Sequence, residues 1–335
     1  MKQLLLKFVD ALNLYPLFNK LTRNTATIFM LHSIHPVANK RSDITTSLLD
    51  QYLGYLQKHN YRVISLADFV QAIKEKRNTS KSVVFTVDDG YRDFYLHAFS
   101  VFRKYGYPAT IFLTGDFIDK RLFMWWDKIE YAFQTSKHSV VDLEFIGMGQ
   151  VQLGDLSQRS QVALDVTRYC KHLSNDDKLS LIDKLLEILG VDTTGQPKGK
   201  YEPLSWDEIK EMMAGGINFH PHTKTHPIMT SIPREQKVVE ITESRKLIET
   251  QLGVKADIFC YPNGQWEDLD DETIEVLKSS GYVAAVTGME GFDNTLGNPD
   301  LFKLRRYPIP YQPVRFKQYV SGIERLKNRV SSNRS

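Results

Sequence analysis

Short runs of β-branched and aromatic residues alternate along this chain with longer stretches of helical periodicity. Strands that are separated by helices run parallel, so this pattern predicts an α/β fold. Eight candidate strands would suit a closed or nearly closed barrel, whose functional residues gather at the carboxyl ends of the strands. The candidate strands are 27–31, 61–65, 83–87, 110–113, 217–219, 258–261, 282–286 and 303–306.

The helical stretches between these strands carry recognisable start signals. Ser65 and Ser205 each precede a helical pattern and are expected to cap its first turn. The segment from about 121 to 201 interrupts the rhythm, with a Trp-rich start and two helical patterns at 158–172 and 176–189. We interpret this segment as a helical insertion in the barrel. The other candidate helices are 48–59, 66–76, 93–105, 206–213, 235–252 and 271–280.

Both ends of the chain are predicted to be amphipathic helices. Apolar residues recur at helical spacing within residues 1–24, but the apolar run is too broken for a signal peptide or a membrane span. Residues 313–335 form a basic helix or tail, which leaves 25–312 for the barrel and its insertion. Each terminal helix has two interpretations: packing on its own domain, or peripheral contact with an anionic membrane.

Charge and cysteine content narrow the class of protein. The chain has 43 Lys and Arg against 40 Asp and Glu, a net charge of +3, which is too balanced for a nucleic-acid binder that works through overall charge. Two cysteines, Cys170 and Cys260, cannot build a disulfide framework and favour a reducing compartment. Without a signal peptide, the expected location is the cytoplasm, with peripheral attachment at the inner membrane face.

Two adjacent carboxylates follow the strand at 83–87. Asp88 and Asp89 come directly before Gly90, which allows a sharp turn. Successive side chains of a strand diverge, so one Asp can bind a metal while its neighbour faces a substrate. Taken alone, the tripeptide also fits an ordinary surface turn.

A histidine cluster follows another candidate strand, at 217–219. His220, His222 and His226 are three of the nine histidines in the chain. His222 and His226 are four residues apart, a spacing that suits two nitrogen ligands of one metal. Together with one Asp carboxylate they would form a two-histidine, one-carboxylate site that leaves positions open for water and substrate. This pattern indicates a catalytic metal.

These two motifs resemble those of the polysaccharide deacetylases, also called carbohydrate esterase family 4 or NodB-homology domains. The resemblance implies a distorted (β/α)7-type barrel, with Asp88 as general base and Asp89, His222 and His226 as ligands of a divalent metal. Zinc is the default metal, and cobalt, nickel or iron accept the same ligands. The resemblance extends from about 27 to 309 and is carried by Met30-Leu31-His32, Thr86-Val87-Asp88-Asp89-Gly90, Phe112-Leu113-Thr114, Trp125-Trp126-Asp127, Leu204-Ser205-Trp206-Asp207-Glu208 and His222-Thr223-Lys224-Thr225-His226.

The chain departs from the family pattern in two places. The family's Arg-x-Pro-Tyr motif appears as Cys260-Tyr261-Pro262-Asn263-Gly264, so the arginine that orients the base is absent there. Either Arg305 or Arg306 could replace it, while Tyr261, Pro262 and Asn263 stay candidates for the substrate and oxyanion site.

The family's late Leu-x-His motif is also missing, because no histidine follows His226. His32, at the end of the first strand, is similar to the acid of the permuted poly-N-acetylglucosamine deacetylases, and we expect it to be the catalytic acid. His35 is a weaker rival.

The expected activity is metal-dependent removal of acetyl groups from a cell-envelope polysaccharide or its lipid-linked sugar precursor. A catalytic histidine favours an N-acetyl over an O-acetyl group, because an amine leaves only after protonation. Tyr91, Trp126 and Trp266 could stack on sugar rings or simply pack in the core. Two alternatives stay open: an amidohydrolase-type C–N hydrolase, suggested by the His220-x-His222 pair, and a glycan-binding descendant without catalysis.

Overall fold

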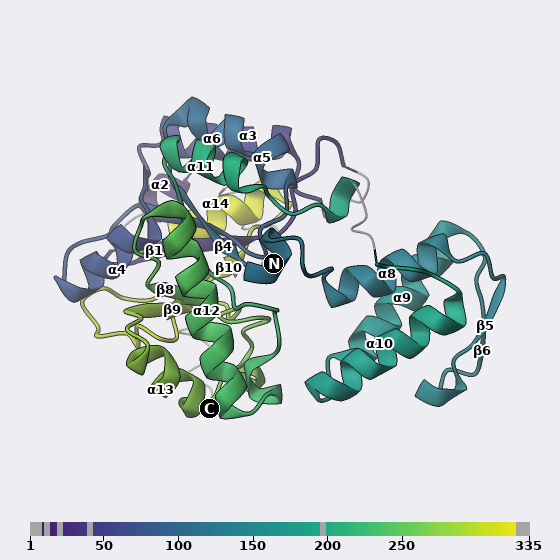
Figure 1. Cartoon of the computed structure of the whole chain (residues 1–335). Coiled ribbons are helices and arrows are strands. Elements are labelled where there is room, and N and C mark those ends of the chain that lie inside the picture. The colour runs from purple at the N-terminus through teal and green to yellow at the C-terminus, as the bar shows by residue number, and fades with distance from the viewer. Residues whose placement is uncertain (1–8, 10–13, 19–22, 39–42, 195–198, 326–335) are drawn as a thin grey trace, which may run out of the picture.

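The computed structural model describes residues 9, 14–18, 23–38, 43–194 and 199–325. Figure 1 shows a central sheet surrounded by helices, with a smaller helical lobe beside it. The main sheet has the order β10-β1-β3-β4-β7, and β2 also pairs with β3. All of its pairings are parallel, which confirms the predicted α/β class. Its strands are β1 (Ala26–Leu31), β2 (Arg62–Val63), β3 (Ser82–Val87), β4 (Ala109–Leu113), β7 (Ile217–Pro221) and β10 (Tyr307–Pro308).

A second parallel pair continues the sheet around the site. It consists of β8 (Ile258–Cys260) and β9 (Ala284–Val286). Where β7 meets β8, the Ile258 amide donates to His220 Nδ1 at 3.3 Å, so a side chain replaces a backbone ladder bond. The strands therefore follow one another as in a barrel, but the described backbone ladder is not continuous.

The expected strand at 303–306 is wrong, because this segment changes neighbours. Leu304 forms an isolated parallel bridge with Val286 on β9. The chain then crosses to β1, where Tyr307 pairs with Phe29. The regular strand β10 consequently begins only at Tyr307, and Arg306 lies in the crossing between the two neighbours.

Most predicted helices form close to their expected bounds. The Ser65 and Ser205 hydroxyls accept from the Asp68 and Glu208 amides, as expected of N-caps. The expected helix 93–105 is divided into two helices, since Thr46 Oγ1 donates to the His97 carbonyl at 2.9 Å. These helices are α3 (Thr46–Lys58), α4 (Leu66–Lys74), α5 (Asp93–His97), α6 (Phe99–Tyr105), α7 (Gly115–Ile118), α11 (Trp206–Ala214), α12 (Arg234–Leu252) and α13 (Asp271–Ser279).

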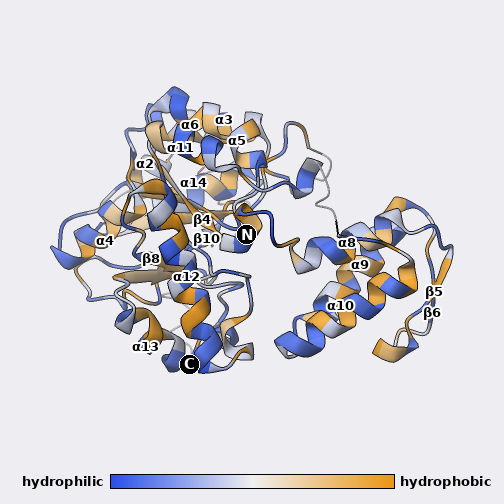
Figure 2. Cartoon of the chain, viewed as in Figure 1, coloured by the Kyte–Doolittle hydropathy of each residue, from blue (hydrophilic) through white to orange (hydrophobic). Residues whose placement is uncertain are grey.

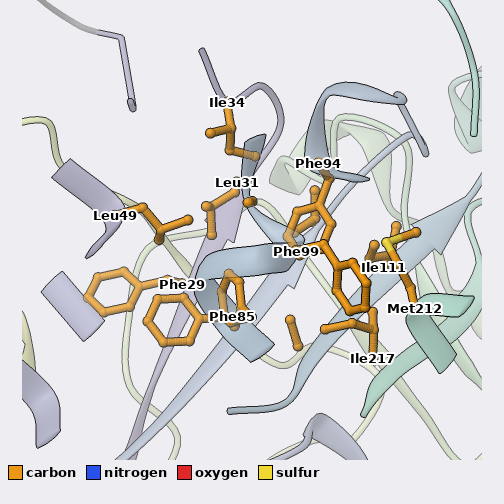
Figure 3. Packing of buried hydrophobic residues seen from close by; sticks show 14 of the residues in the cluster. Phe29, Leu31, Ile34, Leu49, Phe85, Phe94, Phe99, Ile111, Met212 and Ile217 are labelled. Atoms are coloured by element: carbon orange, nitrogen blue, oxygen red, sulfur yellow. The ribbon is translucent and has the colours of Figure 1, made fainter. Parts of the chain in front are cut away.

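The largest apolar core lies between the main sheet and the helices beside it. Figure 3 shows side chains from β1, β3, β4 and β7 that meet side chains of neighbouring helices. Phe29 and Phe85 stack across β1 and β3 with ring centroids 5.7 Å apart. This packing joins β1 and β3, and the next residues along each strand are those of the candidate site.

The helical lobe has a core of its own. It consists of α8 (Trp125–Thr135), the hairpin of β5 (Val140–Asp142) and β6 (Gln150–Gln152), α9 (Leu156–Cys170) and α10 (Asn175–Leu189). Buried side chains from all three helices form one cluster that is separate from the barrel core. In Figure 2 these helices carry both hydrophobic and hydrophilic stripes, as amphipathic helices do. The segment 121–201, predicted as a helical insertion, thus contains a small domain that packs on itself.

The described segments nearest the two ends of the sequence pack against each other. The predicted N-terminal helix falls mostly outside the described residues, which include α2 (Tyr15–Phe18). In α14 (Pro313–Ser321), the buried Phe316 ring stacks on Tyr52 at 4.0 Å. The apolar face of α14 is therefore covered by the barrel. None of the helices in the described part of the chain is long and apolar enough to span a membrane.

Candidate active site

The expected site residues come together at the carboxyl ends of neighbouring parallel strands. His32 follows β1, Asp88 and Asp89 follow β3, and His222 and His226 follow β7. All five line one cavity of about 910 Å³. Parallel strands that share one direction place their carboxyl ends at one edge, so this convergence follows from the topology.

Asp88 is held by a buried arginine. Arg306 donates from Nη1 to Asp88 Oδ1 at 2.7 Å and from Nη2 to Oδ2 at 2.8 Å, a bidentate pair. Its remaining donors reach the Thr287 carbonyl, Thr86 Oγ1 and Cys260 Sγ. Burial would raise the pKa of Asp88, but the guanidinium outweighs it and holds that pKa well below its ordinary value. Asp88 is thus an ionised, fixed carboxylate.

Arg305, the other candidate, does not reach Asp88. Its guanidinium pairs with Asp293 at 3.1 Å, and its backbone amide donates to the same carboxylate at 2.7 Å. Of the two arginines, Arg306 alone has the geometry to orient the base.

Asp89 and two histidines form a compact set of metal-ligating atoms. Asp89 Oδ1 lies 3.5 Å from His222 Nε2 and 3.4 Å from His226 Nε2. The two Nε2 atoms are 3.2 Å apart. His222 Nδ1 lies 2.8 Å from the Cys260 carbonyl, which fixes the ring with Nε2 toward the other ligands. Burial lowers the pKa of His222 to about 4, so the imidazole is neutral, as a metal ligand must be.

This donor set fits a divalent metal such as zinc, which prefers tetrahedral sites of nitrogen, oxygen or sulfur donors. A second grouping of Asp88, His222 and Cys260 also brings potential ligands together. There the Arg306 guanidinium already contacts both the carboxylate and the sulfur, and burial raises the pKa of the Cys260 thiol well above its ordinary value. A cation is therefore better placed among Asp89, His222 and His226.

The turn at Asp89 and the loop between β7 and α12, which we call the ligand loop, both have strained backbone, and other side chains support the ligand loop. Asp89, Thr223 and His226 have φ angles of 75°, 65° and 61°, in the left-handed region that residues other than glycine rarely adopt. The His226 amide donates to Thr223 Oγ1 at 2.9 Å. Glu240 on α12 accepts from the amides of Lys224 and Thr225, each at 2.8 Å.

Glu240 was not expected from the sequence. Its carboxylate also accepts from Thr225 Oγ1 at 2.6 Å, and its side chain is buried. The available signal was a single acidic residue on the buried face of a predicted helix, and that signal does not say which loop the residue meets.

The helical lobe contributes to the cavity through α8. The Tyr91 hydroxyl donates to Asp127 Oδ2 at 2.6 Å and accepts from Trp126 Nε1 at 3.0 Å. The Trp126 ring packs against the His226 ring, with centroids 4.7 Å apart. Tyr91 and Trp126 line the cavity, whereas the third aromatic candidate, Trp266, is 65% exposed and lies outside its lining.

The remaining candidates divide between cavity and core. His32 Nε2 lies 3.8 Å from Asp88 Oδ2, and its side chain is 52% exposed. His35 and Asn263 also line the cavity. Tyr261 and Pro262 are buried outside that lining, and the Tyr261 hydroxyl donates to the Phe302 carbonyl at 3.0 Å.

His220 takes part in the fold rather than in the ligand set. Its Nδ1 accepts from the Ile258 amide, while His222 turns toward Asp89. The His220-x-His222 pair therefore does not converge on one ion, which removes the basis for an amidohydrolase-type site.

Known proteins share parts of the sequence and the fold of this chain. The Polysaccharide deacetylase family model matches residues 75–168 and 172–285. The chain is 21% identical over 265 residues to the Bacillus subtilis protein YxkH, which is named as a polysaccharide deacetylase. The aligned region covers 79% of this chain and 64% of that protein. The chain is also 30% identical over 97 residues to the Escherichia coli poly-beta-1,6-N-acetyl-D-glucosamine N-deacetylase. That aligned region covers 27% of this chain and 14% of the other protein. The chain thus spans less than two thirds of either relative.

Two solved structures show the same fold. The Streptococcus pyogenes deacetylase PplD, in complex with acetate, has a TM-score of 0.59 at 18% identity, covering 90% of this chain and 97% of that one. IcaB from Ammonifex degensii has a TM-score of 0.55 at 15% identity, covering 89% and 97%. Since the family model matches more than half of its length, this chain belongs to the polysaccharide deacetylase family.

Proposed function

We propose that this chain is a metal-dependent hydrolase that removes N-acetyl groups from a cell-envelope glycan or from its lipid-linked sugar precursor. The observation that carries the proposal is the pairing of the Asp88–Arg306 carboxylate with the ligand set of Asp89, His222 and His226 in one cavity. A relative named as an N-deacetylase of poly-beta-1,6-N-acetyl-D-glucosamine supports the choice of substrate class.

Zinc is the first choice of metal for two imidazoles and one carboxylate, and cobalt, nickel or iron accept the same set. When bound, such a metal would polarise the acetyl carbonyl and lower the pKa of a coordinated water.

The residues of the chain would perform the proton transfers. Asp88 is ionised and held by two hydrogen bonds, so it suits the general base that removes a proton from the attacking water. His32 lies beside Asp88 and is open to solvent, so it can donate a proton to the leaving amine and recover one from water. The backbone N–H of Asn263, on the cavity wall, is our candidate to stabilise the negatively charged oxygen that forms during attack.

Acetate release tests this proposal. The substrates are an N-acetylglucosamine oligomer and a lipid-linked N-acetylated sugar, each measured with and without a chelator. We expect Asp88→Asn to lower kcat by roughly 10²–10⁴-fold while the metal content is retained. Full metal-dependent activity of that variant would show that Asp88 is not the base.

A pair of histidine variants tests the assignment of the acid. We expect His32→Gln to lower kcat strongly on an N-acetyl substrate. His35→Gln is the matched control, because His35 lines the same cavity without an ion pair to Asp88 among the described residues. Equal losses in the two variants would contradict the assignment of His32.

A further inference from the structure

The helical lobe supplies one wall of the cavity that holds the metal-ligating residues. Its lining residues come from α8 and the end of α9: Trp125, Trp126, Asp127, Glu130, Thr167 and Lys171. Two of these residues are acidic. Glu130 is neutralised by Lys200, whose Nζ lies 2.6 Å from its carboxylate.

Asp127 forms no ion pair among the described residues, although Lys200 lies close enough to favour its charged form. The residue is 7% exposed, and its Oδ2 accepts from Tyr91. Burial raises the pKa of Asp127 to about 7. No protein group among the described residues donates to Oδ1, and Oδ1 is not one of the fully enclosed atoms, so it is open to the cavity that Asp127 lines. This oxygen can therefore accept a hydrogen bond from a bound molecule.

The position of Asp127 in the site is fixed by its neighbours. Tyr91 follows the Asp88-Asp89-Gly90 turn directly, and its hydroxyl holds the Asp127 carboxylate. Trp126, the preceding residue of α8, donates to the same hydroxyl and packs on the His226 ring. Asp127 thus stands on the cavity wall beside a metal ligand and is held there before any substrate arrives.

We propose that Asp127 is a substrate-binding residue whose Oδ1 accepts a hydrogen bond from the ring hydroxyl next to the acetamide of the sugar. This inference rests on the proposed function, in which the acetamide lies against Asp88 and His32. The adjacent hydroxyl is then the next polar group of the ring. Tyr91 already supplies one donor to this carboxylate, so a neutral hydroxyl suits it better than a cation does. The neighbouring Glu130 is already paired with Lys200, so a cation would find no second free carboxylate there.

Binding of two ligands tests the inference independently of turnover. The ligands are an N-acetylglucosamine trimer and its 3-deoxy analogue, which lacks the hydroxyl next to the acetamide. Kd is measured by calorimetry with the full-length metal-loaded chain carrying Asp88→Asn. We expect Asp127→Ala to weaken trimer binding about 10–100-fold, the size of one hydrogen bond to a charged group, and analogue binding less than about threefold.

Three further variants separate contact from folding. Asp127→Asn keeps an acceptor and should recover part of the trimer affinity. Tyr91→Phe leaves the carboxylate in place but removes the hydroxyl that fixes it, so it should weaken the trimer more than the analogue. Asp165→Asn is the matched control, because Asp165 is an acidic residue of the same lobe outside the cavity lining, and this variant should preserve the difference between the two ligands.

The outcomes for the inference and for the proposed function are distinct. Three results would overturn the role of Asp127. In the first, Asp127→Ala weakens the binding of trimer and analogue equally. In the second it weakens neither, and in the third neither ligand binds even before Asp127 is replaced. Acetate release by the chain without substitutions is measured separately. A chain that binds the trimer through Asp127 but releases no acetate would refute the proposed function and leave this inference standing.

Discussion

Every hydrogen-bond donor of the Arg306 side chain has a partner inside the barrel. Its donors reach Asp88, Thr86, Thr287 and Cys260, so its guanidinium links the proposed base to its own strand and to the two segments that hold Cys260 and Thr287. Removing one member of a buried ion pair typically costs about 3–5 kcal/mol, because the other charge is left uncompensated. We therefore regard Arg306 as a residue that positions the proposed base Asp88 and keeps it ionised.

Substitution of Arg306 should change the pH dependence of catalysis. With the guanidinium present, the pKa of Asp88 is depressed and the base is ionised far into the acid range. In Arg306→Met the largest influence that lowers this pKa is lost, so the pKa rises and the acid limb of kcat/KM moves to higher pH. We expect at least about 10²-fold lower kcat/KM at pH 6 and a smaller loss at pH 8.

A pH–rate profile measures this shift, with Arg305→Met as the matched control because that arginine pairs with Asp293. If both variants moved the acid limb equally, the special role of Arg306 would be refuted.

The residues that the sequence could identify are those at strand ends. Asp88, Asp89, His222 and His226 each follow a recognisable strand, and parallel topology brings such residues together. The choice between Arg305 and Arg306 required the path of a segment that changes neighbours, because adjacent side chains point opposite ways. Glu240 and Asp127 were not recognised as site residues, since their roles depend on contacts between distant parts of the chain.

At the level of elements, the important unit is the ligand loop between β7 and α12. The loop holds left-handed residues at Thr223 and His226, and Glu240 accepts three hydrogen bonds from its middle. Non-glycine residues in this region cost about 1–3 kcal/mol each unless their surroundings compensate. Helix α12 thus stabilises the conformation that directs the two histidines toward Asp89.

Loss of Glu240 should weaken metal binding. Supporting partners of metal ligands typically change affinity by about 10–100-fold, and we expect a loss of that size for zinc in Glu240→Ala. Glu240→Gln, which keeps an acceptor for the loop amides, should recover part of it. Competition with a chromophoric chelator gives the zinc affinity directly, and circular dichroism verifies the fold.

Glu243→Ala is the control, since the exposed Glu243 lies on the same helix and forms an ion pair with the half-buried Lys224 side chain rather than with the loop amides. Unchanged zinc affinity in folded Glu240→Ala would show that the loop keeps its conformation without this support.

The elements themselves were predictable where local signals decide them. Ser65 and Ser205 marked two helix starts correctly because N-capping depends only on neighbouring residues. The division of α5 from α6 depends on Thr46, about fifty residues earlier in the chain, and no local pattern shows it. The segment 303–306 was assigned to a strand although its partners change from β9 to β1 within a few residues.

At the scale of the whole molecule, the candidate site is built by two separately packed bodies. The barrel supplies the proposed base and the proposed metal-ligating residues, and the lobe supplies a wall of the same cavity. The sequence indicated the insertion because the alternation of strands and helices is interrupted at 121–201. That its first helix reaches His226 could not be inferred, because the interface depends on how the lobe is oriented.

Because the lobe has its own core, its stability should influence substrate binding more than metal binding. Leu185 on α10 is fully buried in that core, and Leu185→Ala should cost about 2–5 kcal/mol. Hydrogen exchange should show lost protection across 125–189 and unchanged protection in β1, β3 and β4. We expect KM for an N-acetylated oligomer to rise while zinc content stays constant, whereas Leu179→Ala, at an exposed position of the same helix, should alter neither. Equal loss of protection in the barrel strands would instead mean that barrel and lobe unfold as one cooperative unit. In that case a change in lobe stability could not alter the lobe's side of the cavity without also altering the barrel.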